Sequence, residues 1–129
     1  MKGQAQCSCG NVTLDVDGDP VRVAVCHCYS CQLRTGSAFG VQARFELKDV
    51  KISGATHQYI RTADSGTEIT YHFCPNCGNT IYYFLDGVEH IAIPVGAFAN
   101  EHFPKPKLSI YEDRQYPWLH LDEDMEHWD

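Results

Sequence analysis

Hydrophobic and polar residues alternate along much of the chain, and this period of two predicts half-buried β-strands. Single alternating runs cover residues 12–16, 21–25 and 39–45. A Gly-Asp-Pro sequence at 18–20 separates the first two runs and predicts a turn there. The first third of the chain is therefore expected to form a sheet.

Two later segments predict hairpins, because each places two strand-like runs on either side of a short turn sequence. One hairpin joins residues 57–62 to residues 67–73. The other joins residues 80–85 to residues 88–95 across Asp86-Gly87, a strong two-residue turn signal. Both segments are expected to add antiparallel strands.

Helical signals are weak. Residues 30–35 predict one or two helical turns, and residues 123–128 predict a short final helix. From Glu101 onward the chain is rich in proline and aromatic residues, which indicates an extended segment that wraps the domain. We expect an all-β fold of eight to ten short antiparallel strands, with residues 1–129 forming one domain.

Composition and charge narrow the class of protein. The chain has 129 residues, of which 43% are hydrophobic and 21% charged, as in a globular protein. No apolar run approaches the roughly 18 residues that span a bilayer, and the first residues lack the apolar core of a signal peptide. We therefore expect a cytoplasmic protein. The formal net charge of −7 argues against nucleic acid or an acidic membrane as a partner.

The seven cysteines of the chain point to metal binding or catalysis rather than to disulfides. An odd number leaves one over from any disulfide framework, and thiols stay reduced in the cytosol. Clustered cysteines there indicate a metal site or catalysis. The seven fall into three groups, at 7–9, 26–31 and 74–77.

Cys74 and Cys77 resemble a zinc knuckle, since two cysteines separated by two residues can hold one tetrahedral ion. Gly78 follows directly and can adopt the positive φ that turns backbone N–H groups toward sulfur. A knuckle needs a second pair, and Cys7 and Cys9, also followed by a glycine, are the natural partners. We infer a closed structural zinc site formed by Cys7, Cys9, Cys74 and Cys77.

Cys26, Cys28 and Cys31 remain, and their spacing brings three sulfurs around one point. Three protein ligands and an open fourth position are the form of a catalytic zinc site. All-sulfur ligation favours zinc over magnesium or calcium. In one alternative, Cys7 or Cys9 completes this second site. In another, the cysteines hold an iron–sulfur cluster.

The chain resembles the glutathione-dependent formaldehyde-activating enzymes, a family that includes the domain of centromere protein V. The resemblance covers nearly the whole chain and lies in the order and spacing of several motifs. These are Cys7-Ser8-Cys9-Gly10, Cys26-His27-Cys28-Tyr29-Ser30-Cys31, Gly36-Ser37-Ala38-Phe39, Ser65-Gly66, Phe73-Cys74-Pro75-Asn76-Cys77-Gly78 and the aromatic tail with Trp118.

The resemblance implies an all-β fold similar to that of the Mss4-like proteins, with two zinc ions per chain. One zinc, on Cys7, Cys9, Cys74 and Cys77, is structural. The other, on Cys26, Cys28 and Cys31, lies at the active site. The implied reaction is that of a carbon–sulfur lyase, which joins glutathione and formaldehyde as S-hydroxymethylglutathione. The partner is thus a small thiol or a thiol–aldehyde adduct.

Arg34 is the only basic residue close in sequence to the second site, so it is a candidate contact for an anionic substrate. Ser37 and Phe39 follow the site and are candidates for lining its pocket, the alternative being a turn cap and a core residue. Lys105, Lys107 and Arg114 are further basic candidates from the tail.

His27, between two ligands in sequence, is interpreted as a residue that packs locally or faces solvent, with a proton shuttle as the alternative. Trp118 is interpreted as a core anchor for the tail.

The sequence favours a zinc-dependent carbon–sulfur lyase. The alternative is a zinc-stabilised binding module of the same fold that has no turnover. A nucleic-acid-binding zinc domain is disfavoured by the acidic charge.

Overall fold

The computed structural model describes residues 1–129 and consists mostly of strands. The strands are β1 (Lys2–Gln6), β2 (Thr13–Asp17), β3 (Arg22–Cys26), β4 (Gly40–Glu46), β5 (Val50–Ser53), β6 (His57–Thr62), β7 (Glu68–Phe73), β8 (Thr80–Leu85), β9 (His90–Pro94), β10 (Leu108–Ile110) and β11 (Glu126–His127). The single α-helix is α1 (Tyr29–Thr35), and three 3-10 turns are η1 (Leu47–Asp49), η2 (Val95–Phe98) and η3 (Glu112–Arg114). The all-β class is confirmed, with eleven strands where eight to ten were expected.

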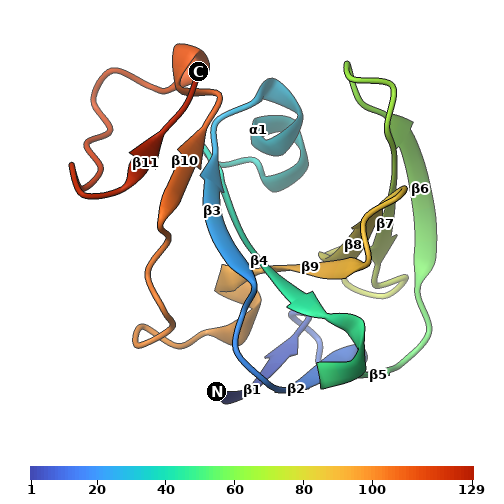
Figure 1. The fold of residues 1–129 in the computed structure, drawn as a ribbon. Helices are drawn as coiled ribbons and strands as arrows, with labels where there is room; N and C mark the ends of the chain where they lie inside the picture. The colour runs from blue at the N-terminus through green and yellow to red at the C-terminus, as the bar shows by residue number, and fades with distance from the viewer.

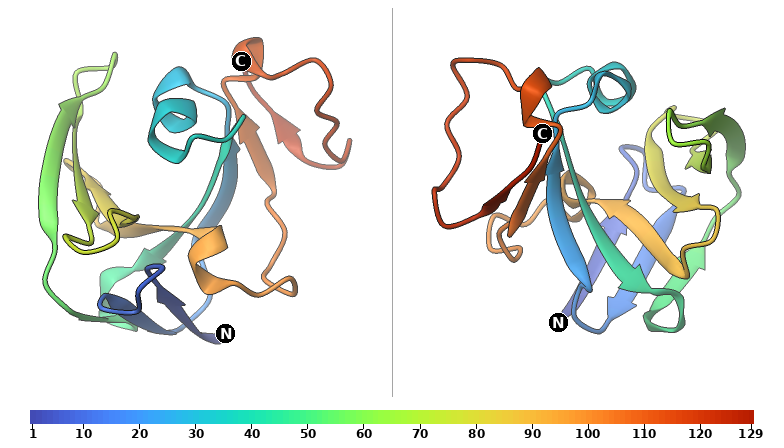
Figure 2. Two further views of the ribbon diagram at one scale, coloured as in Figure 1. Left: turned by 180° about the vertical axis from the view of Figure 1, so that it is seen from behind. Right: turned by 45° about the horizontal axis from the view of Figure 1, so that its top comes forward.

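The strands form two sheets. A three-stranded antiparallel sheet has the order β1-β2-β5, and an eight-stranded sheet has the order β11-β10-β3-β4-β9-β8-β7-β6. β10 pairs in parallel with both β3 and β11, while the other pairs are antiparallel. The large sheet is bent, so that β3 and β10 stand on one side, β6 and β7 on the other, and α1 lies between them (Figures 1 and 2).

The main core is built from the alternating runs. On β2 the side chains of Leu14 and Val16 are buried, while Asp15 and Asp17 between and after them are exposed. The same period on β4 buries Ala43 and Phe45 completely. Apolar side chains from both sheets meet in one cluster, so the hydrophobic effect holds the small sheet against the large one.

The end of the chain differs from the expectation. Residues 123–128 form no α-helix; Glu126–His127 instead form β11, which lies parallel to β10. The backbone N–H of Glu126 donates to the carbonyl of Lys107, and that of Trp128 to the carbonyl of Ser109, both at 2.9 Å. These bonds satisfy polar backbone groups that a short helix would leave unpaired at its ends.

Trp118 is also placed differently from the expectation. Its side chain is 64% exposed, so it is not a core anchor. It packs edge-on against Tyr116, with ring centroids 5.4 Å apart. The tail is instead held by β10 and β11, through backbone pairing that the sequence pattern does not reveal.

The helix α1 has seven residues and lies where residues 30–35 predicted it. Cys28 is its N-cap and Gly36, in the left-handed conformation, is its C-cap. No helix of the chain is both long enough and apolar enough to cross a membrane.

Candidate functional site

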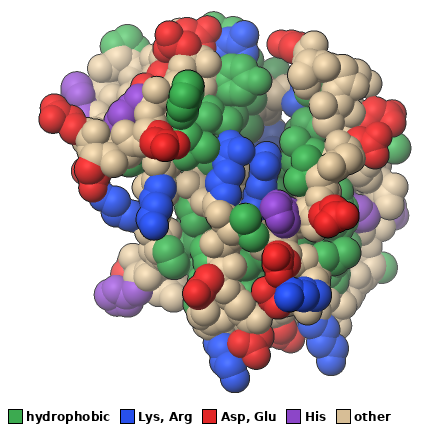
Figure 3. Space-filling model, viewed as in Figure 1, with side chains coloured by type: hydrophobic (Ala, Val, Ile, Leu, Met, Phe, Trp, Pro, Cys, Tyr) green, Lys and Arg blue, Asp and Glu red, His purple; other side chains and the backbone are tan.

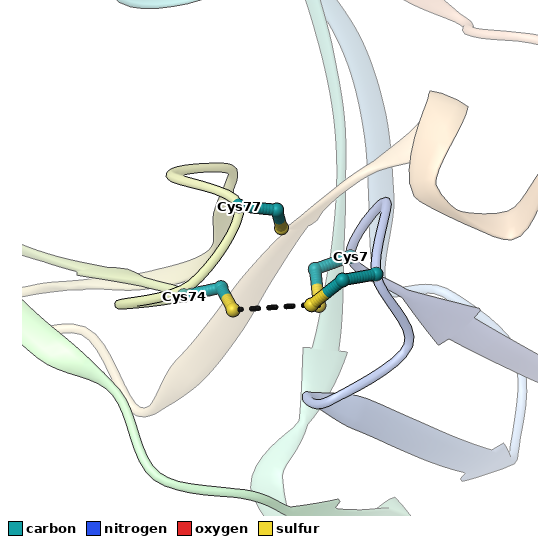
Figure 4. A group of neighbouring side chains, drawn as sticks. Cys7, Cys74 and Cys77 are labelled. Carbon is teal, nitrogen blue, oxygen red and sulfur yellow. Dashed lines mark hydrogen bonds between the residues drawn. The ribbon is translucent and has the colours of Figure 1, made fainter.

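Four cysteines from two distant turns meet on one side of the large sheet. Cys7 and Cys9 lie in the loop after β1, and Cys74 and Cys77 lie in the turn between β7 and β8. Figure 4 shows Cys74 and Cys77 pointing from their turn toward Cys7. All four Sγ atoms lie within 4.8 Å of one another.

The spacing of these sulfurs fits a zinc ion. The Sγ atoms of Cys7 and Cys9 are 3.7 Å apart, and those of Cys9 and Cys74 are 3.6 Å apart. Four sulfurs placed tetrahedrally at ~2.3 Å from a zinc ion are separated by about 3.8 Å. The cluster could therefore hold a metal ion without rearrangement of the chain.

The backbone conformation after each cysteine pair explains how its sulfurs are oriented. Gly10 and Gly78 both have a φ of 79°, in the left-handed region, as expected for glycines that follow the ligand pairs. Their N–H groups donate back to the carbonyls of Cys7 at 3.0 Å and Cys74 at 2.8 Å. Backbone N–H groups of Asn79 and Cys9 lower the pKa of Cys77 to about 6, so this thiol ionises readily.

The other three cysteines meet at the junction of β3 and α1. Cys26 ends β3, Cys28 caps α1, and Cys31 lies in the first turn of α1, with its N–H 3.3 Å from the Sγ of Cys28. The three Sγ atoms lie within 4.8 Å of one another, so this cluster could also hold a metal ion. The structure thus separates the sulfurs into four and three, and neither Cys7 nor Cys9 joins the triplet.

The three thiols of the triplet shift one another's pKa. Hydrogen bonds from Cys26 and Cys31 lower the pKa of Cys28 strongly. Hydrogen bonds to Cys28 and Cys31, and then burial, raise the pKa of Cys26. No histidine, aspartate or glutamate completes the cluster as a fourth ligand. The arrangement therefore leaves one side of the triplet for a ligand from outside the chain.

A pocket of about 210 Å³ opens beside the triplet, and arginines dominate its charge. Arg22, Arg34, Arg44 and Arg61 line it, which are four of the five arginines in the chain, and all four are partly buried. Figure 3 shows Lys and Arg side chains gathered at the middle of this face, where it is hollowed between α1 and the strands opposite. An acidic protein thus has a locally basic site.

Two of these arginines contact tyrosine side chains. The guanidinium of Arg34 lies 5.4 Å from the ring centroid of Tyr83 and 5.8 Å from that of Tyr71, with one nitrogen 3.9 Å from the Sγ of Cys31. Arg61 donates to the hydroxyl oxygen of Tyr71 at 3.5 Å. Both cations are thereby kept close to the sulfurs.

The remaining two are paired with each other across strands. Arg22 on β3 lies directly opposite Arg44 on β4. Burial, and then the neighbouring charge of Arg44, lower the pKa of Arg22. Like charges directly opposite one another destabilise a strand pair, so this pair indicates a binding role rather than a structural one.

Sequence reasoning anticipated Arg34 but missed Arg22, Arg44 and Arg61. A signal was available on β3, because Arg22, Ala24 and Cys26 alternate and must therefore share one face of the sheet. The pairing of β3 with β4 then brings Arg44 to that face, and no sequence pattern predicts this register.

The basic tail residues do not reach the pocket. Lys105 is paired with Asp122 and Asp124, and Arg114 lies over the rings of Tyr29 and Tyr111. None of Lys105, Lys107 and Arg114 lines the cavity.

Ser37 and Phe39 also lie away from the triplet pocket. They line a separate hollow together with Tyr29, Tyr116 and Trp118, outside the lining of the cavity at the sulfurs. Gly36 ends α1 and turns the chain, so the residues after it leave the sulfur side. Of the three expected substrate contacts, Arg34, Ser37 and Phe39, only Arg34 lines the pocket at the triplet.

His27 is fully buried, and its Nε2 lies 2.9 Å from the hydroxyl of Ser109 on β10. It does not line the pocket, although both of its neighbours in sequence do. This supports the interpretation that His27 packs locally, and it removes the reason to consider it as a proton shuttle.

Two comparisons with known proteins are informative. Residues 2–114 match the family model described as glutathione-dependent formaldehyde-activating enzyme. The fold is similar to a crystal structure of a Rhodobacter sphaeroides protein, with a TM-score of 0.57 and 18% sequence identity over 98% of this chain and 99% of that chain. At that identity the likeness establishes a shared fold and nothing about activity.

Proposed function

Because the chain belongs to the glutathione-dependent formaldehyde-activating enzyme family, we propose that it is a zinc-dependent carbon–sulfur lyase acting on a thiol–aldehyde adduct. In this proposal the 129 residues act as one zinc-binding domain with two ions. Cys7, Cys9, Cys74 and Cys77 hold the structural ion, and the triplet holds the ion at the active site. The observation that carries the proposal is the three-sulfur cluster open to a basic pocket.

The reaction is balanced without redox chemistry. In the direction of synthesis, the thiolate sulfur forms a bond to the carbonyl carbon, and the electrons of the C=O π bond move to oxygen. That oxygen takes up one proton, which balances the proton lost by the thiol. In the reverse direction the C–S bond breaks, the hydroxyl proton is removed and the aldehyde leaves.

The chain supplies the electrostatic environment for a sulfur anion. A zinc ion bound by the triplet would act as a Lewis acid that favours the thiolate form of a thiol. Arg34 and the amide nitrogen of Gln42 each lie 3.9 Å from the Sγ of Cys31 and point hydrogen-bond donors at it. Arg22 and Arg44 attract an anionic substrate toward the cavity.

We propose that Tyr71 transfers the proton to and from the oxygen atom of the aldehyde or its adduct. It lines the pocket, and its hydroxyl oxygen accepts a hydrogen bond from Arg61, which leaves its own O–H free to donate to the substrate. The hydroxyl can thus give and regain a proton as the adduct forms and breaks.

The test is the exchange rate between free glutathione and its formaldehyde adduct, measured by NMR on zinc-loaded protein. We expect a rate enhancement that is lost in Cys28→Ser, and a fall of roughly 10²-fold in Tyr71→Phe. Tyr82→Phe is the matched control, because Tyr82 on β8 is likewise buried but does not line the triplet pocket or the hollow that Tyr71 also lines. No enhancement by the wild type, or full activity in Cys28→Ser, would contradict the proposal and favour a binding module.

A further inference from the structure

The pocket beside the triplet contains positive charge that the protein itself does not neutralise. Four arginines line it, and no aspartate or glutamate does. None of the four takes part in any of the ion pairs of the structure. A zinc ion on three thiolates adds one net negative charge, so the lining stays positive with the metal bound.

A buried donor in the lining also lacks a partner. The Nε of Arg61 is inaccessible to solvent and makes no hydrogen bond. Buried donors are nearly always paired, so the guanidinium of Arg61 has hydrogen-bonding capacity that the protein does not use. For a guanidinium, the matching partner is a carboxylate, sulfonate or phosphate oxygen.

A second hollow shares three lining residues with the pocket and adds no negative charge. Arg34, Arg61 and Tyr71 also line an outer hollow of about 330 Å³, whose lining likewise contains no carboxylate. The inner cavity alone, at about 210 Å³, is smaller than the ~300–1,000 Å³ usual for ligand sites. A substrate with its sulfur at the triplet therefore extends past Arg34 and Arg61 and meets only cations and neutral groups along the way.

We propose that this site selects thiols whose charged groups are all anionic over thiols that also carry an ammonium group. The inference rests on the proposed function and specifies its substrate class. Carboxylates, sulfonates and phosphates pair with the arginines, whereas an ammonium would sit among like charges with no carboxylate to receive it. Glutathione, which carries an α-ammonium beside one of its two carboxylates, is on this account a poorer ligand than its amine-free analogue.

The test compares glutathione with glutaryl-cysteinylglycine, the same molecule without the α-ammonium. Binding of each to the zinc-loaded protein is measured by isothermal titration calorimetry at one ionic strength. We expect the dissociation constant of the amine-free thiol to be lower by about tenfold. Equal binding, or tighter binding of glutathione, would overturn the proposal.

Two variants that each remove one positive charge test whether the preference between the two thiols arises in the pocket. Arg44→Gln should reduce the ratio of the two dissociation constants, while Lys51→Gln, which removes the same charge from an exposed position on β5, should leave it unchanged. Arg22→Gln serves in place of Arg44→Gln if circular dichroism shows that the latter is misfolded. An unchanged ratio in the folded arginine variant would overturn the proposal.

Binding and turnover can fail separately. If glutathione binds more tightly but its formaldehyde adduct is turned over, the lyase proposal stands and the selectivity proposal is wrong. If the amine-free thiol binds more tightly but neither adduct is turned over, the selectivity stands and the lyase proposal is wrong.

Discussion

His27 and its two neighbours in sequence are directed to different environments. Cys26 and Cys28 face the pocket, while the imidazole of His27 is buried against β10 and bonded to Ser109. Burial lowers the pKa of His27, so the neutral ring is favoured. The histidine therefore anchors the segment that carries the three cysteines to the tail.

Replacing Ser109 with alanine should destabilise the protein by about 1–3 kcal/mol, because Nε2 of His27 would lose its only partner while buried. The measurement is the free energy of unfolding in urea. Ser53→Ala, at an exposed position on β5, is the control and should stay near zero. A Ser109→Ala value equal to the control would show that the hydrogen bond contributes nothing.

A second prediction at the scale of single residues concerns the glycines that follow the cysteine pairs. Gly78→Ala should cost roughly 1–2 kcal/mol, since an L-residue at positive φ is strained although no atom lies near the added carbon. Gly78→Asn should cost less, because asparagine tolerates this conformation.

Gly96→Ala is the matched control for that substitution. Gly96 also has open space around it but does not have a positive φ, so alanine there should be neutral or slightly stabilising. Similar losses at both glycines, measured by urea unfolding, would mean that backbone conformation is not the cause.

The cysteine groups and Arg34 could be predicted from sequence because their chemistry depends on short spacings. Arg22, Arg44 and Arg61 could not be assembled in the same way, since each comes from a different strand. Their meeting depends on register and on the bend of the sheet, and both are set by tertiary packing.

At the scale of elements, the alternating runs predicted the longer strands well, because the period of two follows from burial on one face. No such run covers β1 or β5, and the pattern also failed at β10 and β11, which have only three and two residues. Strands this short carry too few residues to show a period, and their pairing is defined by backbone hydrogen bonds to β3 and to each other.

A surface ion pair ties β11 to η3 and predicts a pH dependence of the tail. Nδ1 of His127 lies 2.7 Å from a carboxylate oxygen of Glu112. This contact raises the pKa of His127 above its ordinary 6.5. For Glu112, burial works to raise the pKa, but hydrogen bonds from His127 and Ser109 outweigh it and lower the pKa below 4.5.

The stabilisation by His127 is therefore complete below pH 6.5 and is lost as the pH rises through its raised pKa. The stabilisation contributed by Glu112 is present above pH 4.5 and is lost as the pH falls through the lowered pKa of Glu112. We expect hydrogen-exchange protection at the amide of Trp128, which bonds to Ser109, to fall as the pH is raised above neutrality. Glu112→Gln should abolish this dependence, and a protection factor that stays constant from pH 6 to 8.5 in the wild type would contradict it.

At the scale of the whole molecule, metal ions in the two cysteine clusters would link different parts of the chain. The four-cysteine cluster links the loop after β1 to the β7–β8 turn, 65 residues apart at Cys9 and Cys74. The triplet lies within six residues at the end of β3 and links nothing distant. Closing a long loop restricts the unfolded chain more than closing a short one.

Metal removal should therefore affect stability mainly through the four-cysteine cluster, since binding free energy at such a site is folding free energy. Chelator titration followed by circular dichroism should show retention of the strand signal until the last ion is lost. Loss of the fold with the first ion removed would contradict this assignment.

The most direct test of two separate metal centres is the zinc content per chain, measured by elemental analysis on three proteins. These are the wild type, the triple variant Cys26→Ser, Cys28→Ser, Cys31→Ser, and the double variant Cys74→Ser, Cys77→Ser. We expect two ions in the wild type, one in the folded triple variant, and loss of the fold in the double variant. One ion in both the wild type and the triple variant would contradict it, because the triplet would then hold no metal of its own.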